Sequence, residues 1–218
     1  MTSLRGPEAH APRWSPDSKD IVFHANVDGA QDLYVVSAAG GAPRRLTHGP
    51  GNNMWASWSH DGEWIYFASN RTGQYQCWRV LAAGGEAVQI TKGGGYGGFE
   101  SADGRFLYYP RSYMSGVIWR VPVAGGEEAP VDEAVATLRG PANYVVAREG
   151  IYTASSENLH RGFRLQLYRF ATGKIEVLAT IGQPLGRGGM SLSPDARWLL
   201  FTDSARQHGD LMLVENFR

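Results

Sequence analysis

Carboxylates recur along this 218-residue chain in one local pattern. Asp17, Asp61, Asp103 and Asp195 each stand two residues after a serine, and Glu100 lies directly before the third of these serines. Two carboxyl groups about 5–10 Å apart could cleave a glycosidic bond, one as acid and the other as base or nucleophile. Four equivalent aspartates indicate instead a repeated turn that the aspartate side chain caps. Glu100 is then the single carboxylate expected on an inner strand, and one carboxylate is not a catalytic pair.

Other nucleophile, phosphate and metal patterns do not occur in the sequence. There is no Gly-x-Ser-x-Gly nucleophile elbow, and the glycine-rich segment KGGGYGG, residues 92–98, has no strand–loop–helix unit around it. The one cysteine, Cys77, lies in an apolar strand-like run, and the six histidines show no ligand spacing. We therefore predict no catalytic residues, no metal site, no cofactor and no enzymatic activity. A structural calcium held by loop carbonyls and carboxylates stays open.

Charge and hydropathy narrow the classes of partner. The 21 basic and 21 acidic residues give a formal net charge of zero, whereas nucleic acid binding needs a concentrated basic field. A membrane span needs a run of about 18 apolar residues, and the chain has none. We therefore expect no nucleic acid partner and no membrane insertion. The N-terminal MTSLRGPEAHAPRW lacks the apolar core of a signal peptide, and both periplasm and cytoplasm stay open as locations.

A repeat of a little over forty residues accounts for the carboxylate pattern. The first three aspartates are 44 and 42 residues apart, and the gap to Asp195 is 92 residues, two periods with a degenerate copy at 143–155 between them. Gly-Gly pairs recur with a similar spacing, at 40–41, 84–85 and 125–126. Each unit is interpreted as four short strands joined by Asp-Gly or Gly-Gly turns, and no window has a helical period.

Four antiparallel strands repeated at this period predict an all-β fold, a five-bladed β-propeller of four-stranded antiparallel blades. We expect one domain over residues 1–218. Its ring is expected to close through an N-terminal strand, residues 3–6, which pairs with the last blade and leaves no open sheet edge there. The expected blades are 11–48, 56–92, 97–139, 143–180, and 190–218 plus 3–6. The alternative, that these are five blades of a larger ring, stays open.

The landmarks of the repeat resemble a known family. They stand here as WSPDSKDIVF…DLYVV…GG…RRLT and WSHDGEWIYF…CWRV…GG…VQIT. This pattern is similar to the TolB-like Pro-Asp β-propeller repeat family, closest to the C-terminal propeller domains of bacterial winged-helix or kinase regulator proteins. The resemblance implies a bacterial, non-catalytic propeller. His60 and Ala102 replace the proline of the repeat, and the sequence has no winged-helix or kinase portion, so regulatory activity does not follow.

The loops that lead into the inner strands carry the side chains best suited to binding, because propellers usually bind ligands at the mouths of their channels. Amide, aromatic and arginine groups around one mouth suit a peptide or a small polar ligand. The candidate ligand-binding residues are His10, Asn53, Trp55, Tyr96, Glu100, Asn143, Tyr144 and Arg187. The alternative is that these side chains line a water-filled channel.

The sequence thus predicts a monomeric, non-catalytic propeller that binds a protein or peptide partner as a sensor or scaffold module. A five-bladed glycan-active enzyme is the alternative from another class, because such enzymes resemble this architecture. A propeller fragment with no autonomous function is a third. Six recurring tryptophans are expected to pack between blades and not to contact a ligand. They are Trp14, Trp58, Trp64, Trp78, Trp119 and Trp198.

Overall fold

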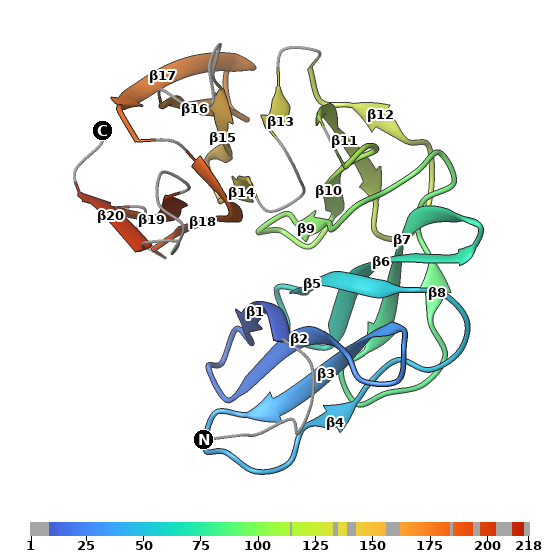
Figure 1. The fold of residues 1–218 in the computed structure, drawn as a ribbon. Helices are drawn as coiled ribbons and strands as arrows, with labels where there is room; N and C mark the ends of the chain where they lie inside the picture. The colour runs from blue at the N-terminus through green and yellow to red at the C-terminus, as the bar shows by residue number, and fades with distance from the viewer. Residues whose placement is uncertain are drawn as a thin grey trace. The chain divides into compact units, whose positions relative to one another are not determined.

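The computed structural model of the chain contains β-strands as its only regular elements in the part that it describes (Figure 1). That part is residues 9–113, 115–132, 135–138, 143–155, 162–183, 185–193, 197–203 and 211–215. No helix with the length and hydropathy of a membrane span occurs in these ranges. The chain divides into two compact units, which are described separately. Unit 1 is residues 1–111 with 119–129, and unit 2 is residues 112–118 with 130–218.

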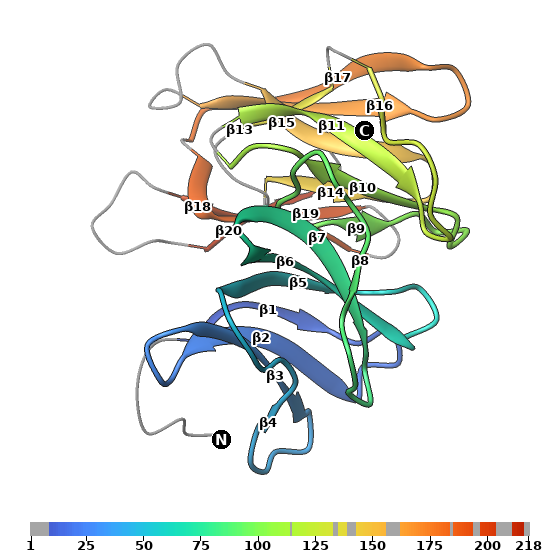
Figure 2. The same cartoon turned by 90° about the vertical axis from the view of Figure 1, so that its right-hand side faces the viewer.

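Unit 1 contains two four-stranded antiparallel sheets in which the strands are neighbours in chain order (Figures 1 and 2). The first sheet is β1 (Ala9–Trp14), β2 (Asp20–Asn26), β3 (Gln31–Ser37) and β4 (Arg44–Arg45). The second is β5 (Asn53–Trp58), β6 (Trp64–Thr72), β7 (Gln74–Leu81) and β8 (Val88–Gln89). The second strand of each sheet is buried through its middle, as its apolar run predicts for a strand covered on both faces.

The third sheet has one strand more than the repeat predicts. Its order is β9 (Phe99–Glu100), β10 (Phe106–Pro110), β11 (Ser115–Pro122) and β12 (Ala129–Pro130), and β13 (Ala136–Leu138) also pairs with β11. β13 pairs with Ser115–Val117 of β11. A second segment bonds to β11 just beyond these residues, where Val131 donates its N–H to the carbonyl of Ile118 at 2.9 Å. The edge of the eight-residue β11 is therefore long enough for two short partners.

Unit 2 holds the last two sheets. The fourth sheet is β14 (Tyr144–Val146), β15 (Gly150–Ser155), β16 (Phe163–Arg169) and β17 (Lys174–Ile181), again in chain order. The fifth is β18 (Leu185–Leu192), β19 (Trp198–Asp203) and β20 (Leu211–Glu215). The prediction of an all-β propeller with five antiparallel blades is confirmed. The strand expected from residues 3–6, and with it the closure of the ring, lies outside the described residues.

The repeated serine and aspartate form the turn between the first two strands of a blade. Ser15 donates its hydroxyl to Oδ1 of Asp17 at 2.7 Å, and the Ser15 hydroxyl oxygen accepts the N–H of Asp20 at 2.9 Å. Oδ1 of Asp17 also accepts the N–H of Lys19 at 3.1 Å. The same bonds recur in the next two blades at Ser59–Asp61 and Ser101–Asp103.

These hydrogen bonds to the carboxylates lower their pKa values, with the bond from the serine hydroxyl as the largest cause. The pKa of Asp17 and that of Asp103 are each lowered to about 2, and the pKa of Asp61 is lowered as well. The three described turn aspartates are therefore ionised acceptors within their own turns. Asp195, the fourth, lies outside the described residues.

The core of unit 1 forms where one sheet packs against the next. Val22 and Leu33 of the first sheet, both fully buried, belong to one cluster with Phe67 and Trp78 of the second. A second cluster joins the second and third sheets and includes Cys77, whose thiol pKa is raised by burial. Trp58, Trp78 and Trp119 pack in these clusters as the sequence predicted, whereas Trp14 keeps 59% of its surface exposed.

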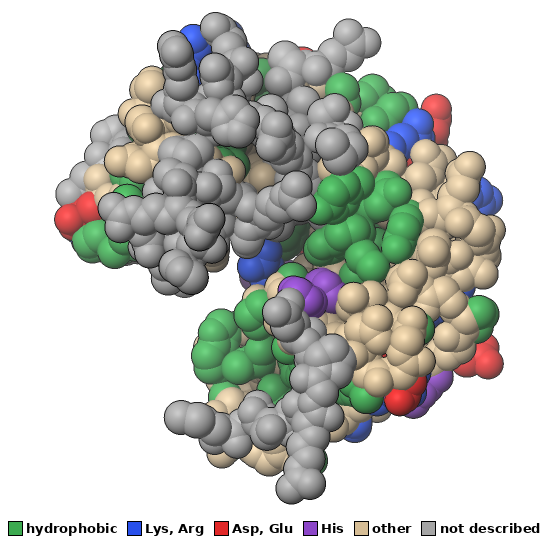
Figure 3. Space-filling view, viewed as in Figure 1, with side chains coloured by type: hydrophobic (Ala, Val, Ile, Leu, Met, Phe, Trp, Pro, Cys, Tyr) green, Lys and Arg blue, Asp and Glu red, His purple; other side chains and the backbone are tan. Residues whose placement is uncertain are grey.

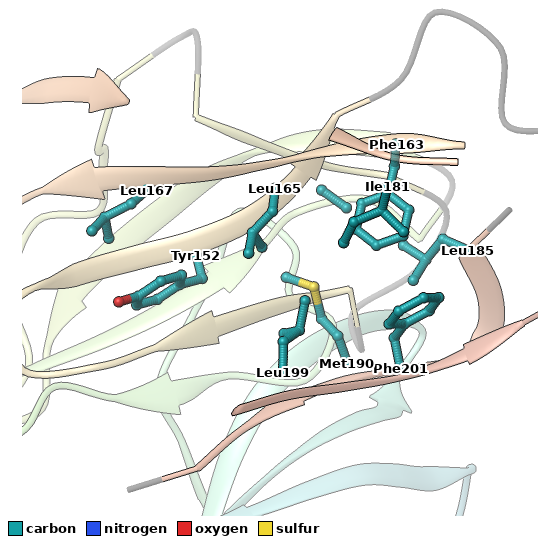
Figure 4. Packing of buried hydrophobic residues seen from close by; sticks show 10 residues of the cluster. Tyr152, Phe163, Leu165, Leu167, Ile181, Leu185, Met190, Leu199 and Phe201 are labelled. Carbon is teal, nitrogen blue, oxygen red and sulfur yellow. The ribbon is translucent and has the colours of Figure 1, made fainter. Parts of the chain in front are cut away.

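The core of unit 2 joins the fourth and fifth sheets in the same way. Phe163 and Leu165 of β16 point toward Met190 of β18 and toward Leu199 and Phe201 of β19 (Figure 4). The rings of Phe163 and Phe201 meet edge to face with their centroids 5.2 Å apart. Blade-to-blade packing of large apolar side chains therefore stabilises both units.

Candidate functional site

The inner strands share an unusual backbone conformation just before they enter the turn. Four residues before the turn serine, the chain adopts a positive φ in four blades: 49° at Ala11, 53° at Trp55, 52° at Gly97 and 88° at Gly189. In β1, β5 and β18 the strand register shifts across this position, so each of these strands carries a β-bulge there. Trp55 is the bulky exception at a position where two other blades use glycine, and a bulky residue in this conformation is strained.

Trp55 belongs to a cluster of three aromatic side chains in unit 1. The centroid of its ring lies 6.1 Å from that of Tyr75 and 5.6 Å from that of Tyr96, and the two tyrosine rings are 4.9 Å apart. All three side chains are half-buried. We call these three residues the aromatic cluster. In the space-filling view, hydrophobic side chains gather over the region of β9 and β10 on the face in view (Figure 3).

The loop that carries Tyr96 is fixed by hydrogen bonds from consecutive main-chain N–H groups. Gly94 donates to Oε1 of Gln76 at 3.0 Å, Gly95 to the carbonyl of Tyr75 at 3.0 Å, and Tyr96 to the carbonyl of Pro110 at 3.0 Å. At Gly95 a Cβ would stand 2.7 Å from both N and Sγ of Cys77, so the glycine is required by this close approach. The cluster therefore rests on a preorganised backbone.

The main chain of Trp55 is hydrogen-bonded to one of two stacked histidines. The main-chain N–H of Trp55 donates to Nδ1 of His24 at 3.4 Å, and the ring of His24 stacks on that of His10 with centroids 5.5 Å apart. Burial and then the proximity of His10 lower the pKa of His24 to about 4. His24 is therefore neutral near pH 7, which leaves Nδ1 free to accept from Trp55, while the side chain of His10 is exposed.

Asn53, two residues before Trp55, belongs to a buried hydrogen-bond network. Asn53 is fully buried; its Nδ2 donates to Oδ1 of Asp32 at 2.9 Å, and its Oδ1 accepts from Arg71 at 2.9 Å. Asp32 in turn accepts hydrogen bonds from the Thr47 hydroxyl, at 2.7 Å, and from Arg45. Asn53 was a candidate contact, but in the structure both ends of its amide are used inside the protein.

Glu100, the carboxylate that the sequence singled out, is also engaged by protein groups. Its Oε1 accepts the hydroxyl hydrogen of Tyr66 at 2.8 Å, and its Oε2 accepts the main-chain N–H of His60 at 2.5 Å. Burial, followed by this bond to Glu100, raises the pKa of Tyr66. Through these two hydrogen bonds Glu100 links the third sheet to the second.

The other candidates belong to unit 2, and the structure does not relate them to the aromatic cluster. Asn143 and Tyr144 are 2% and 0% exposed, which makes them part of the packed interior of that unit. Arg187 lies on β18, and its side chain is outside the described atoms. Within the described ranges, no three His, Cys, Asp or Glu side chains are gathered as metal ligands would be. The expectations of no metal and no cofactor remain predictions.

The sequence placed Trp55 and Tyr96 among eight candidates around one channel mouth but gave no place to Tyr75. Tyr75 stands at the start of β7, directly after the turn that joins β6 to β7. In a blade of antiparallel strands, the turn between strands two and three lies at the same end as the loop into strand one. From its place beside that turn, Tyr75 could therefore have been predicted to lie near Trp55 and Tyr96.

The five antiparallel sheets define the chain as a β-propeller. Residues 2–136 match the family model described as the TolB beta propeller domain, and the chain belongs to that family. No curated protein gives a significant match.

Solved structures confirm the architecture. TolB from Acinetobacter baumannii superposes with a TM-score of 0.76 at 17% identity, over 96% of this chain and 52% of that one. A putative TolB from Agrobacterium tumefaciens gives 0.67 at 21% identity, over 93% and 73%. Oligogalacturonate lyase from Vibrio parahaemolyticus gives 0.61 at 13% identity, over 98% and 77%. The chain spans about half the length of the Acinetobacter protein, and identities this low show the fold alone.

Proposed function

We propose that this chain is a non-catalytic propeller module that binds a protein or peptide partner through the aromatic cluster of unit 1. The observation that carries the proposal is the half-buried contact of Trp55, Tyr75 and Tyr96, with ring centroids 4.9 to 6.1 Å apart. Trp and Tyr dominate the binding energy of protein interfaces because they bury large areas with few rotatable bonds.

The backbone of the site supports the same proposal. Strained conformations persist at binding sites when the surrounding structure holds them, and Trp55 keeps a φ of 53° in a position where Gly97 and Gly189 serve elsewhere. The N–H groups of Gly94, Gly95 and Tyr96 all have acceptors, so little loop entropy is lost on binding. A rigid aromatic surface of this kind suits an extended or turn-forming peptide segment.

A catalytic alternative has less support from the described residues. Glycoside chemistry needs two free carboxyl groups at the reaction centre. Glu100 accepts hydrogen bonds at both oxygens, from Tyr66 and His60. Each described turn aspartate accepts, through Oδ1, the serine hydroxyl and an N–H group of its own turn. We therefore assign binding, not bond cleavage, to this chain. That the module acts as a monomer remains a prediction.

Selection from a random-peptide phage library tests the proposal. The library is panned in parallel against the wild-type chain, Trp55→Ala, Tyr96→Ala and the control Trp14→Ala, which removes an exposed tryptophan outside the cluster. We expect peptides that bind the wild type and Trp14→Ala and that lose at least about 30-fold in affinity on either cluster variant. The proposal is wrong if no peptide is enriched, or if the enriched peptides bind all four proteins equally.

A further inference from the structure

The loop that carries Tyr96 begins with a turn whose N–H groups point at one carboxylate. The main-chain N–H groups of Lys92 and Gly93 both donate to Oε1 of Glu128, at 2.5 and 3.2 Å. Oε2 of the same carboxylate accepts the Tyr109 hydroxyl at 2.7 Å and the Arg111 guanidinium at 2.8 Å. Four donors therefore converge on one carboxylate.

The groups around this carboxylate are themselves held in place. The Arg111 guanidinium carbon lies 3.2 Å from the centroid of the Trp119 ring, so the cation is stacked as well as paired. A Cβ at Gly93 would stand 2.7 Å from Nη2 of Arg111 and 3.0 Å from Oε2 of Glu128, so a side chain there would displace the ends of these two side chains. Successive N–H groups that converge in this way are a recognised anion-binding arrangement.

The carboxylate comes from a different part of the chain. Glu128 follows the hairpin at Gly125 and Gly126, which joins β11 to β12 and is exposed, yet the Glu128 side chain is only 12% exposed. Its neighbour Glu127 is exposed. Burial alone would raise the pKa of Glu128, but the bonds from Lys92, Tyr109, Arg111 and Gly93 outweigh it, and the pKa is lowered.

We propose that the Lys92–Gly93 turn, Tyr109 and Arg111 form a carboxylate-binding site that the chain's own Glu128 occupies, and that this occupancy positions the loop presenting Tyr96. Together with the acceptors of Gly94, Gly95 and Tyr96, it gives all five consecutive N–H groups from Lys92 to Tyr96 a partner. Glu128 is thus a positioning residue for the aromatic cluster. The expected effect of Glu128 on peptide affinity rests on the proposed function. The existence of the carboxylate site does not depend on that proposal.

Chemical rescue with acetate tests the site without any partner. In Glu128→Ala we expect amide hydrogen exchange at Lys92 and Gly93 to accelerate at least about tenfold, because charge-assisted hydrogen bonds are lost. Sodium acetate should slow that exchange again, and sodium chloride at equal ionic strength should not. Glu127→Ala, the matched control next to it, should exchange at these two amides as the wild type does, with or without acetate. If Glu128→Ala does not fold, Glu128→Gln, which fills the site without its charge, is measured without acetate, and exchange at Lys92 and Gly93 as slow as in the wild type would overturn the site.

The results separate this inference from the proposed function. Acetate that fails to slow exchange in the Glu128 variant, or slows it equally in the wild type and in Glu127→Ala, overturns the carboxylate site. If the site is confirmed, a selected peptide should bind Glu128→Ala more weakly than wild type and recover affinity in acetate. If acetate restores peptide affinity in Glu128→Ala but not in Tyr96→Ala, Glu128 acts by positioning the loop. Failure to select any peptide contradicts the proposed function and leaves the exchange result standing.

Discussion

Tyr66 donates its hydroxyl hydrogen to Oε1 of Glu100 at 2.8 Å, and this bond joins the second blade to the inner strand of the third. Tyr66 is fully buried, so its hydroxyl needs a partner inside the protein. Tyr109 and Tyr152, 43 and 86 residues further along the chain, solve the same problem with Glu128 and Glu149. A tyrosine–glutamate pair is therefore a recurring device in this propeller.

Tyr66→Phe is expected to destabilise the chain by about 1–2 kcal/mol, because Glu100 loses a hydrogen-bond donor at a partly buried carboxylate. Urea unfolding monitored by tryptophan fluorescence measures the change. We expect a structural role for Glu100, so Glu100→Gln should leave the affinity for a selected peptide within about twofold of wild type. A loss of peptide binding without a loss of stability would make Glu100 a contact residue instead.

The stability of the chain should fall as the pH is lowered from about 6.5 to about 4. The pKa of His24 in the folded chain is about 4, below its ordinary value of 6.5, so in this window the unfolded chain binds a proton that the folded chain does not. Each pKa unit of this difference corresponds to about 1.4 kcal/mol. The measurement is the urea midpoint at several pH values.

His24→Gln is the control for this pH dependence, because it retains an acceptor for the N–H of Trp55 and cannot titrate. Its midpoint should change less across the same window. Asp17, Asp103 and Glu128 also have lowered pKa values and lose stability toward the acid end of this window, but they are present in both proteins, so their contribution cancels in the comparison. An identical pH dependence in the wild type and His24→Gln would show that another group is responsible.

Glycine should be better tolerated than alanine at position 55. The backbone φ of 53° favours glycine, so Trp55→Gly is expected to be more stable than Trp55→Ala by about 1 kcal/mol. At Trp58, whose φ is not positive, the order should reverse. Urea unfolding of the four variants measures both differences. Alanine equal to or better than glycine at position 55 would contradict the strained conformation.

Removing a turn serine should weaken the blade that contains it. Ser59→Ala deletes the bond to Asp61 and leaves the N–H of Trp64 without its 2.8 Å acceptor, with an expected cost of about 1–3 kcal/mol. Thermal unfolding followed by circular dichroism measures it. The control is Ser37→Ala in an exposed hairpin, which should change stability by no more than about 0.5 kcal/mol. Equal melting temperatures for both variants would refute the capping role of Ser59.

The repeat made the fold and its turns predictable. The serine, the aspartate and the glycine pairs act through local backbone chemistry, so their spacing alone indicates where strands end. The third sheet was predicted less well, because one strand can have two short partners and sequence spacing does not fix which segment pairs. That outcome depends on the length of β11 and on where the chain returns to its edge.

The candidate site was predictable only in part, for a physical reason. Trp55 and Tyr96 lie in loops of the same kind, and that similarity placed them together. Burial is a tertiary property, and the same loops also hold Asn53 and Tyr144, which are 0% exposed. Glu128 belongs to a hairpin that no loop pattern connects with Tyr96. Its role follows only from the four donors that the folded chain brings around one carboxylate.

The indole and amide resonances of the wild-type chain give the most direct test of the binding surface. A peptide selected from the library is titrated into ¹⁵N-labelled protein. We predict chemical-shift changes at the Trp55 indole N–H and at the amides of Gly95 and Tyr96, with the Trp14 indole unchanged. Shifts centred on Trp14, or a binding peptide that leaves Trp55 and Tyr96 unperturbed, would contradict binding through the aromatic cluster.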